Sequence, residues 1–363
     1  MSPLFHSFAA RRNGWSSVVD NRKSTSGDTE AQPPSATGYY LIAVPRSPLA
    51  PHAVVDNDRL RYPRRNGATT RYLTEAEVAA AYADRLASIN AQALRSQEVE
   101  RFAINDLDRQ AHAWVLVSLV PDHPGDVDIN FAALQKFETE VQGKLGLGGL
   151  TSEHVLHFRR TSVRYRRLIA DGGERSPLAE KIYASFHSDG SGAFAVQLRD
   201  LLGPEQRQML RQSPWLTFLV SDEYIALSVI AGLLNLADHA VNRAATGGNA
   251  LLRARIVSGG GAAHTPTIGH TRGSSGARVL GSINTDQIED AAETSAPLDE
   301  LPAPGQALMA TAARLCHELG QAFGAPELPQ LTRDGQIRLS AWSGQTKADI
   351  SSWADENDVP TVG

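Results

Sequence analysis

The stretch Ala113–Val141 reads AWVLVSLVPDHPGDVDINFAALQKFETEV and predicts a strand followed by a helix. Its first part, Ala113–Val120, is an apolar run rich in β-branched residues, which is typical of a buried strand. Proline and glycine then interrupt the pattern and mark a loop. The apolar residues of the second part fall on one side of a helix: Phe131, Leu134, Phe137 and Val141.

The same alternation of strands and helices continues along the chain. Strands are expected at 153–169, 180–198, 250–257 and 336–342, and helices at 204–212, 222–243 and 306–323. The second of these strand segments contains SDGSG, a hairpin turn signal. Interleaved strands and helices predict an α+β protein with mixed α/β layers.

Length and composition allow two domains with tails. The chain has 363 residues, 42% of them apolar, and a formal net charge of −5. An acidic balance means that nucleic-acid binding could come only from local basic clusters. The single cysteine, Cys316, excludes an intramolecular disulfide and fits a reducing cytoplasm, and we expect it to be buried. Because no 18-residue window is continuously apolar, we predict a cytoplasmic protein without a membrane span.

The composition changes along the chain and divides it into segments. We expect a partial domain, a linker rich in glycine and acids, and loose ends around a second α+β domain of unknown role. The predicted bounds are 1–37 for a disordered leader, 38–95 for the partial domain, 105–258 for the second domain, 259–303 for the linker, 304–345 for a helix and strand packing on the second domain, and 346–363 for an acidic tail.

A cluster of arginines stands just before a well-marked helix. The segment from Arg59 to Arg85 reads RLRYPRRNGATTRYLTEAEVAAAYADR, and its first half has no acid. Thr74 and Glu77 form a capping-box pattern that starts the helix. Guanidinium groups bind phosphate oxygens in pairs, so the cluster is a candidate phosphate-binding site. Its members are Arg59, Arg61, Arg64, Arg65 and Arg71. The alternative is that they form ion pairs with nearby acids such as Glu77.

A second basic segment is FRRTSVRYRR, Phe158–Arg167. If it is one strand, Arg164 and Arg166 lie on the same face and could extend a nucleic-acid surface. The alternative is a solvated edge strand whose charges oppose aggregation. We include Arg164 and Arg166 among the candidate nucleic-acid-binding residues.

No catalytic or metal-binding constellation is identified. His187 and Asp189 belong to the predicted hairpin turn, and His264 and His270 lack a third ligand at a suitable spacing. The segment GHTRGSSGAR lacks the Lys-Ser/Thr ending of a phosphate loop, so it is interpreted as linker. We therefore predict no catalytic residues, no metal and no defined cofactor site.

Residues 38–85 resemble the C-terminal third of the Schlafen-type AlbA-like domain of bacterial proteins, which are labelled DNA-binding or ATP-binding. The matching residues occur in the family's order: Val44, Pro45, Ser47, Pro51, His52, Arg65, Gly67, Thr70 and Glu75 to Glu77. The family's domain has an acidic patch and a Gly-Gly strand before this part. The residues before Tyr39 contain neither, so we expect a domain that lacks its front. The resemblance implies binding of nucleic acid or of a nucleotide such as ATP.

The sequence thus favours a nucleic-acid-binding or regulatory protein, with DNA and RNA both open as ligands. One alternative is an ATP-binding or nucleolytic enzyme that is truncated or inactive here. A second alternative is a protein-interaction module. The oligomeric state is not predicted.

Overall fold

The computed structural model shows a mixed α+β protein. It describes residues 50–56, 58–109, 112–141, 150, 156–172, 181–198, 201, 218–258, 266–271, 277–279 and 291–363. All of these belong to the compact unit Pro45–Gly363. The expected leader 1–37 and the expected helix 204–212 lie outside the described residues.

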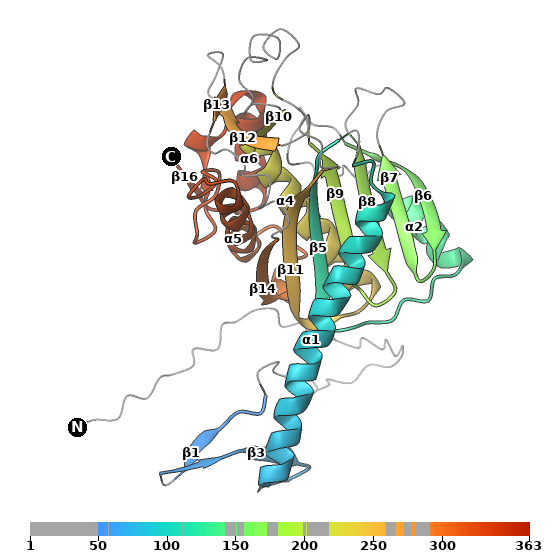
Figure 1. Ribbon diagram of the computed structural model, residues 1–363, viewed down its shortest axis with the longest axis vertical. Coiled ribbons are helices and arrows are strands. Elements are labelled where there is room, and N and C mark those ends of the chain that lie inside the picture. The colour runs from blue at the N-terminus through green and yellow to red at the C-terminus, as the bar shows by residue number, and fades with distance from the viewer. Residues whose placement is uncertain are drawn as a thin grey trace, which may run out of the picture. The chain divides into compact units, whose positions relative to one another are not determined.

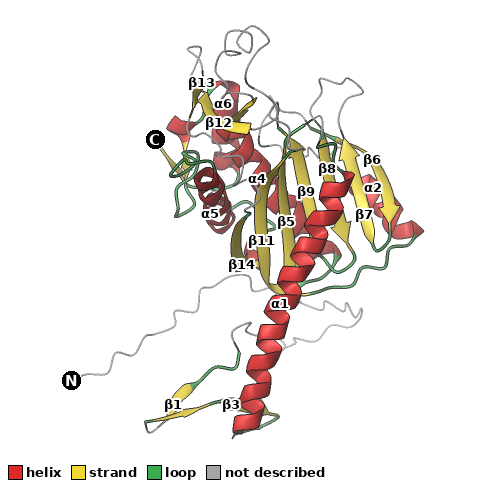
Figure 2. Ribbon diagram, viewed as in Figure 1, coloured by secondary structure: helices red, strands yellow, loops and turns green. Residues whose placement is uncertain are grey.

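A seven-stranded antiparallel sheet organises this unit (Figures 1 and 2). The strand order is β14-β11-β5-β9-β8-β7-β6, so that the long strand β5 lies near the centre. The bounds are β5 Trp114–His123, β6 Phe158–Arg164, β7 Arg167–Gly172, β8 Ile182–His187, β9 Gly192–Gln197, β11 Gly247–Val257 and β14 Ala292–Pro297.

Helices cover both faces of the sheet. They are α1 Glu75–Asp106, α2 Phe131–Val141, α4 Asp222–Asp238 with the π-helical η1 His239–Arg243, and α5 Gln306–Ala322. A further helix, α6 Gly344–Glu356, follows near the C-terminus. Alternate residues of β5 belong to two separate hydrophobic clusters: Val115 and Val117 are in the larger one with α4, and Trp114 and Leu116 are in the smaller one with α1. Burial on both faces explains why the sequence of β5 is a continuous apolar run.

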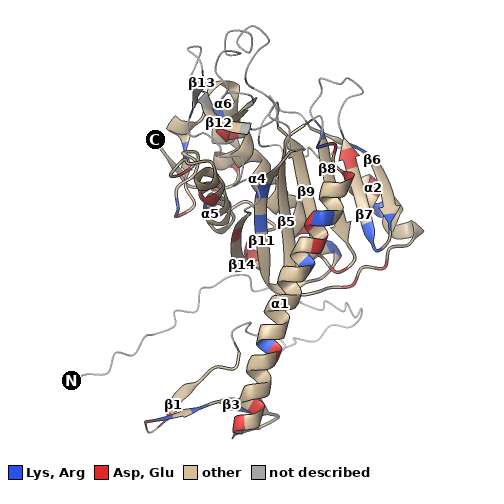
Figure 3. Ribbon diagram, in the orientation of Figure 1, with Lys and Arg blue, Asp and Glu red and all other residues tan. Residues whose placement is uncertain are grey.

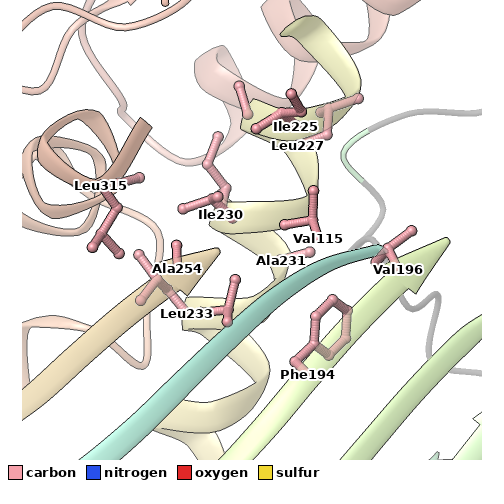
Figure 4. Close-up of a cluster of buried hydrophobic side chains, with 14 of the residues drawn as sticks. Val115, Phe194, Val196, Ile225, Leu227, Ile230, Ala231, Leu233, Ala254 and Leu315 are labelled. Carbon is pink, nitrogen blue, oxygen red and sulfur yellow. The ribbon is translucent and has the colours of Figure 1, made fainter. Parts of the chain in front are cut away.

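The helix α4 fills the larger core. Figure 4 shows Ile230 and Leu233 of α4 near Val115 and Ala254 of the sheet. The segment Asp222–Arg243 is long and apolar enough to span a membrane, but 78% of its most apolar window is buried inside the protein. Burial in a core explains its apolar composition equally well. Cys316 of α5 is also buried here, as predicted, and burial raises its pKa to about 12.

Four small sheets complete the described structure. Two are hairpins before α1, one is a three-stranded sheet, and one pairs two short strands near the C-terminus. Their strands are β1 Val54–Asp56 with β2 Arg59–Arg61, β3 Pro63–Asn66 with β4 Thr69–Tyr72, β10 Phe218–Ser221 with β12 Pro266–Thr271 and β13 Ala277–Val279, and β15 Ile337–Arg338 with β16 Thr361–Val362. Two short 3-10 helices are η5 Leu298–Glu300 and η6 Leu339–Ala341.

Several elements differ from the sequence-based expectations. The segment 153–169 is not one strand, because β6 and β7 form a hairpin. Phe131 is exposed at the start of α2 instead of facing the core. Parts of 259–303 form β12, β13 and β14, and the last of these pairs with β11 and buries Ala292 and Ala296. The acidic end forms α6, since Ile350, Trp353 and Ala354 share one buried helix face.

Candidate nucleic-acid interface

Two tight hairpins hold the five clustered arginines. In the β3–β4 hairpin, Arg64 lies directly opposite Arg71, and Asn66 lies opposite Thr69. The turn therefore consists of Gly67 and Ala68, and Gly67 has a φ of +57°, which a glycine adopts without steric cost. This register fixes which arginines share a face of the hairpin.

The start of α1 neutralises one of these arginines. Thr74 and Glu77 form the predicted capping box: the amide of Thr74 donates to Glu77 Oε2 at 2.9 Å, and the amide of Glu77 donates to Thr74 Oγ1 at 3.4 Å. Arg71 donates to both oxygens of Glu77, at 2.9 and 2.6 Å. The hydrogen bond from Arg71 is the main reason that the pKa of Glu77 is lowered to about 2. Arg71 is thus a structural partner of the helix cap.

A second arginine is held within the β1–β2 hairpin. Arg61 forms an ion pair of 3.4 Å with Asp56, and its guanidinium lies 4.7 Å from the ring centroid of Tyr72. The other tyrosine of the segment, Tyr62, packs edge-on against Tyr82 of α1 with centroids 6.3 Å apart. For Arg61 and Arg71, the expectation of pairing with acids is therefore confirmed.

Three arginines of the cluster remain open to solvent. Arg59, Arg64 and Arg65 are exposed, and none forms an ion pair with a described residue. Arg65 only donates Nε to the carbonyl of Gly67, at 3.1 Å, which leaves its terminal nitrogens available. Figure 3 shows basic segments along these hairpins. We refer to Arg59, Arg64 and Arg65 as the hairpin arginines.

The second basic segment is a hairpin tip rather than one face of a strand. Arg164 lies opposite Arg167, and Tyr165 and Arg166 form the turn between them. The prediction that Arg164 and Arg166 share a strand face is therefore wrong, because the chain reverses between them. Both are exposed, whereas Arg160 pairs with Asp171 at 2.6 Å. The tip thus presents exposed basic groups without a carboxylate partner among the described residues, as does Arg159 beside the paired Arg160.

A polar junction joins α1 to the β8–β9 turn, and sequence reasoning did not identify it. Arg95 donates Nε to Asp189 at 2.8 Å and an Nη to Glu98 at 2.7 Å. Its other Nη lies 3.0 Å from Nδ1 of His187 and 3.1 Å from Ser191 Oγ. Because arginine can only donate, Nδ1 of His187 is an acceptor. The predicted turn at Asp189 is confirmed. Arg95 and Asp189 are 94 residues apart in the sequence, so no local sequence pattern could predict their contact.

Two buried histidines lie next to this junction. Burial lowers the pKa of His187 to about 3, and the charge of Arg95 acts in the same direction. Burial lowers the pKa of His239 to about 4, with Arg243 contributing, and its Nε2 donates to the carbonyl of His187 at 2.8 Å. Both rings are therefore neutral at pH 7. Nδ1 of His187 accepts from Arg95 and Nε2 of His239 donates to a backbone carbonyl, so one nitrogen of each ring serves the fold.

Arginines on the sheet are also internally paired. Glu100 of α1 is buried and lies 3.3 Å from Arg253 Nη1 and 3.1 Å from Arg255 Nη1. Ser118 of β5 donates Oγ to the same carboxylate at 3.0 Å. Basic residues of β11 thus serve the contact between α1 and the sheet, and they add nothing to an anion-binding surface.

Comparisons with known proteins do not identify a family for the chain, so the functional assignment rests on the residues described above. No family model, curated protein or solved structure matches the chain. Within the described ranges, no group of three or more His, Cys, Asp or Glu side chains is placed to hold a metal ion.

Proposed function

We propose that the protein binds the phosphate backbone of nucleic acid through the hairpin arginines. The observation that supports this proposal is that only some of the five clustered arginines pair with carboxylates. Arg61 and Arg71 are engaged by Asp56 and Glu77, but Arg59, Arg64 and Arg65 are exposed without carboxylate partners among the described residues. Three open guanidinium groups within one pair of short hairpins form a local basic site on a protein with a net charge of −5.

The chemistry of this site favours the backbone over the bases. A guanidinium group can donate two parallel hydrogen bonds to a phosphate, and each neutralised phosphate releases counterions. The binding is therefore expected to be sequence-independent and to weaken steeply with salt. Arg164 and Arg166 at the β6–β7 tip provide a second exposed basic element for the same ligand.

Binding of labelled DNA and RNA oligonucleotides at 50 and 200 mM salt tests the proposal. Each contact contributes to the salt dependence, and a loss of about 10-fold or more in affinity between these concentrations is expected for several contacts. The decisive variant is the triple substitution R59A/R64A/R65A, which removes the open groups and leaves both ion pairs in place. We expect it to abolish retention at the higher salt concentration.

Two matched variants separate a specific site from a general charge effect. The triple variant K136A/R333A/K347A removes the same number of positive charges from exposed positions elsewhere and is expected to bind as the wild type does. The variant R59K/R64K/R65K keeps the charge but loses the bidentate geometry, so weakened but salt-sensitive binding is expected. Equal loss of binding in both alanine triples would contradict the proposed site.

A further inference from the structure

We propose that Tyr165 at the tip of the β6–β7 hairpin stacks on an unpaired base, so that the preferred ligand is single-stranded nucleic acid. This inference rests on the proposed function and adds a ligand class to it. It is based on the conformation, exposure and charged neighbours of one aromatic residue.

Tyr165 is the most exposed large apolar side chain among the described residues, with 90% of its surface accessible. Aromatic rings are normally buried or packed against neighbours, because their apolar area is costly to hydrate. Two tyrosines of the hairpins before α1 have such neighbours: Tyr62 contacts Tyr82, and Tyr72 lies under Arg61. Tyr165 makes no ring contact with any described residue. Both of its ring faces are therefore available.

The tip that carries Tyr165 is a tight two-residue turn. Arg164 and Arg167 are paired across the hairpin, and Arg166 has a φ of +54°, a conformation that non-glycine residues rarely adopt. The backbone of Arg166 is held in place by Ser188, whose amide donates to the Arg166 carbonyl at 2.9 Å. Arg166 Nε in turn donates to Ser188 Oγ at 3.1 Å.

The adjoining β8–β9 turn is itself fixed. The carbonyl of Ser188 accepts from the amide of Val127 at 2.7 Å, and Asp189 is bound by Arg95 of α1. On the other side of the tip, Arg167 lies 4.5 Å from the ring centroid of Phe102. Because its supports are ordered before a ligand binds, little backbone freedom is lost on stacking, which favours binding.

The charges around Tyr165 match the backbone that accompanies a base. Arg164 and Arg166 flank the ring and are both exposed, and neither forms an ion pair with a described residue. Arginine contacts to the phosphates combined with an aromatic platform are the usual means of binding single strands without sequence preference. In a duplex, neighbouring bases already cover both faces of each base. The ring can therefore stack fully only on an unpaired base.

The test compares a single-stranded oligonucleotide with a duplex of the same sequence, using the full chain and fluorescence anisotropy. A 2-aminopurine base in the single strand reports stacking directly. We expect Tyr165→Ala to weaken single-strand binding about 10-fold and to leave duplex binding unchanged. Tyr165→Phe keeps the ring and should bind as the wild type does, while Tyr165→Leu keeps apolar area without the ring and should behave like the alanine variant.

The possible outcomes distinguish this inference from the proposed function. If Tyr165→Ala binds single strands as tightly as the wild type does, while R59A/R64A/R65A loses binding, the stacking role is wrong and the proposed function stands. If Tyr165→Ala weakens single-strand and duplex binding equally, or does not change the 2-aminopurine signal, stacking is also excluded. If the wild type binds neither ligand, both proposals fail. Far-ultraviolet circular dichroism of each variant verifies folding, which an exposed side chain should not affect.

Discussion

The two halves of α1 share one helix face that lies in opposite environments. Tyr82, Ile89, Ser96 and Ala103 follow one another at seven-residue intervals and so lie on one side of the helix. Tyr82 and Ile89 are 39% and 50% exposed, whereas Ser96 and Ala103 are 1% and 0% exposed. The second half lies on β5, β9 and β11, and the first half adjoins the small hairpins. Periodicity therefore identifies a helix face without indicating what covers it.

The charges of the two regions differ in the same way. Where α1 lies on the sheet, Glu100 binds Arg253 and Arg255. Next to the first half, the hairpin arginines keep open guanidinium groups. Arginine on the sheet thus contributes to the fold, and arginine on the hairpins is available for a ligand.

The largest effect is expected from Glu100→Ala. This substitution removes the buried carboxylate that pairs with two partly buried guanidinium groups, Arg253 and Arg255, and that accepts from the hydroxyl of Ser118, while Arg253 keeps its ion pair of 3.2 Å with Glu293. Removing one partner from a buried ionic cluster typically costs about 3–5 kcal/mol of unfolding free energy. Denaturant unfolding measures this loss.

The control for this prediction is Glu98→Ala. Glu98 pairs with Arg95 at 2.7 Å, but its side chain is 44% exposed. An exposed pair of this kind contributes about 0–1 kcal/mol. Similar losses of unfolding free energy for Glu100→Ala and Glu98→Ala would show that the buried cluster on the sheet stabilises the fold no more than an exposed ion pair does.

A smaller effect is expected from truncating the apolar face of α1 in each half. Val99→Ala removes a fully buried side chain that packs on the sheet, at a cost of about 1.5–3 kcal/mol. Leu86→Ala removes a side chain that is 61% exposed, and a change within about 0.5 kcal/mol is expected. Thermal or denaturant unfolding checks both variants. A large loss for Leu86→Ala would mean that another surface covers the first half.

Acid should affect the two regions in different pH windows. His187 and His239 stay neutral in the folded protein down to about pH 3 and 4, but in the unfolded chain they take up protons below their ordinary pKa of 6.5. Stability is therefore expected to fall as the pH drops from 6.5 towards 4, by at most about 1.4 kcal/mol per pH unit for each histidine. Glu77 has a lowered pKa, so its contribution is present above 4.5 and is lost only as the pH falls towards 2.

Unfolding curves between pH 7 and 4.5 measure the histidine contribution. In His239→Gln, the side-chain amide can still donate to the carbonyl of His187 but cannot titrate. The variant is therefore expected to lose less stability over this range than the wild type does. Identical slopes for the two proteins would contradict the assignment of His239 as a buried neutral ring.

Much of the fold could be predicted from the sequence, because the deciding signals are local. The apolar run of β5, the capping box at Thr74 and the turns at Gly67 and Gly190 each depend on a few adjacent residues. The contacts of Arg95 with Asp189 and of Glu100 with Arg255 span 94 and 155 residues, so no local pattern could indicate them.

For the candidate site, the sequence could identify the arginines but not their partners. Asp56 forms an ion pair with Arg61 because the register of the β1–β2 hairpin brings the two residues together. Glu77 pairs with Arg71 because the helix cap places Glu77 beside it. The reversal at Tyr165 was missed, since Arg166 adopts a positive φ without the glycine or asparagine that usually marks such a turn. Which arginines stay unpaired, and that Tyr165 is exposed, therefore depend on ion-pair partners and on a turn that the sequence does not indicate.

The dependence of single-strand affinity on salt concentration tests the central claim most directly. Each phosphate contact adds about 0.7 to the slope of log K against log salt for a single strand. If the hairpin arginines bind phosphates, the slope for R59A/R64A/R65A is smaller than the wild-type slope by about 2. Equal slopes in the two proteins would show that these arginines do not contact the backbone, and would contradict the account.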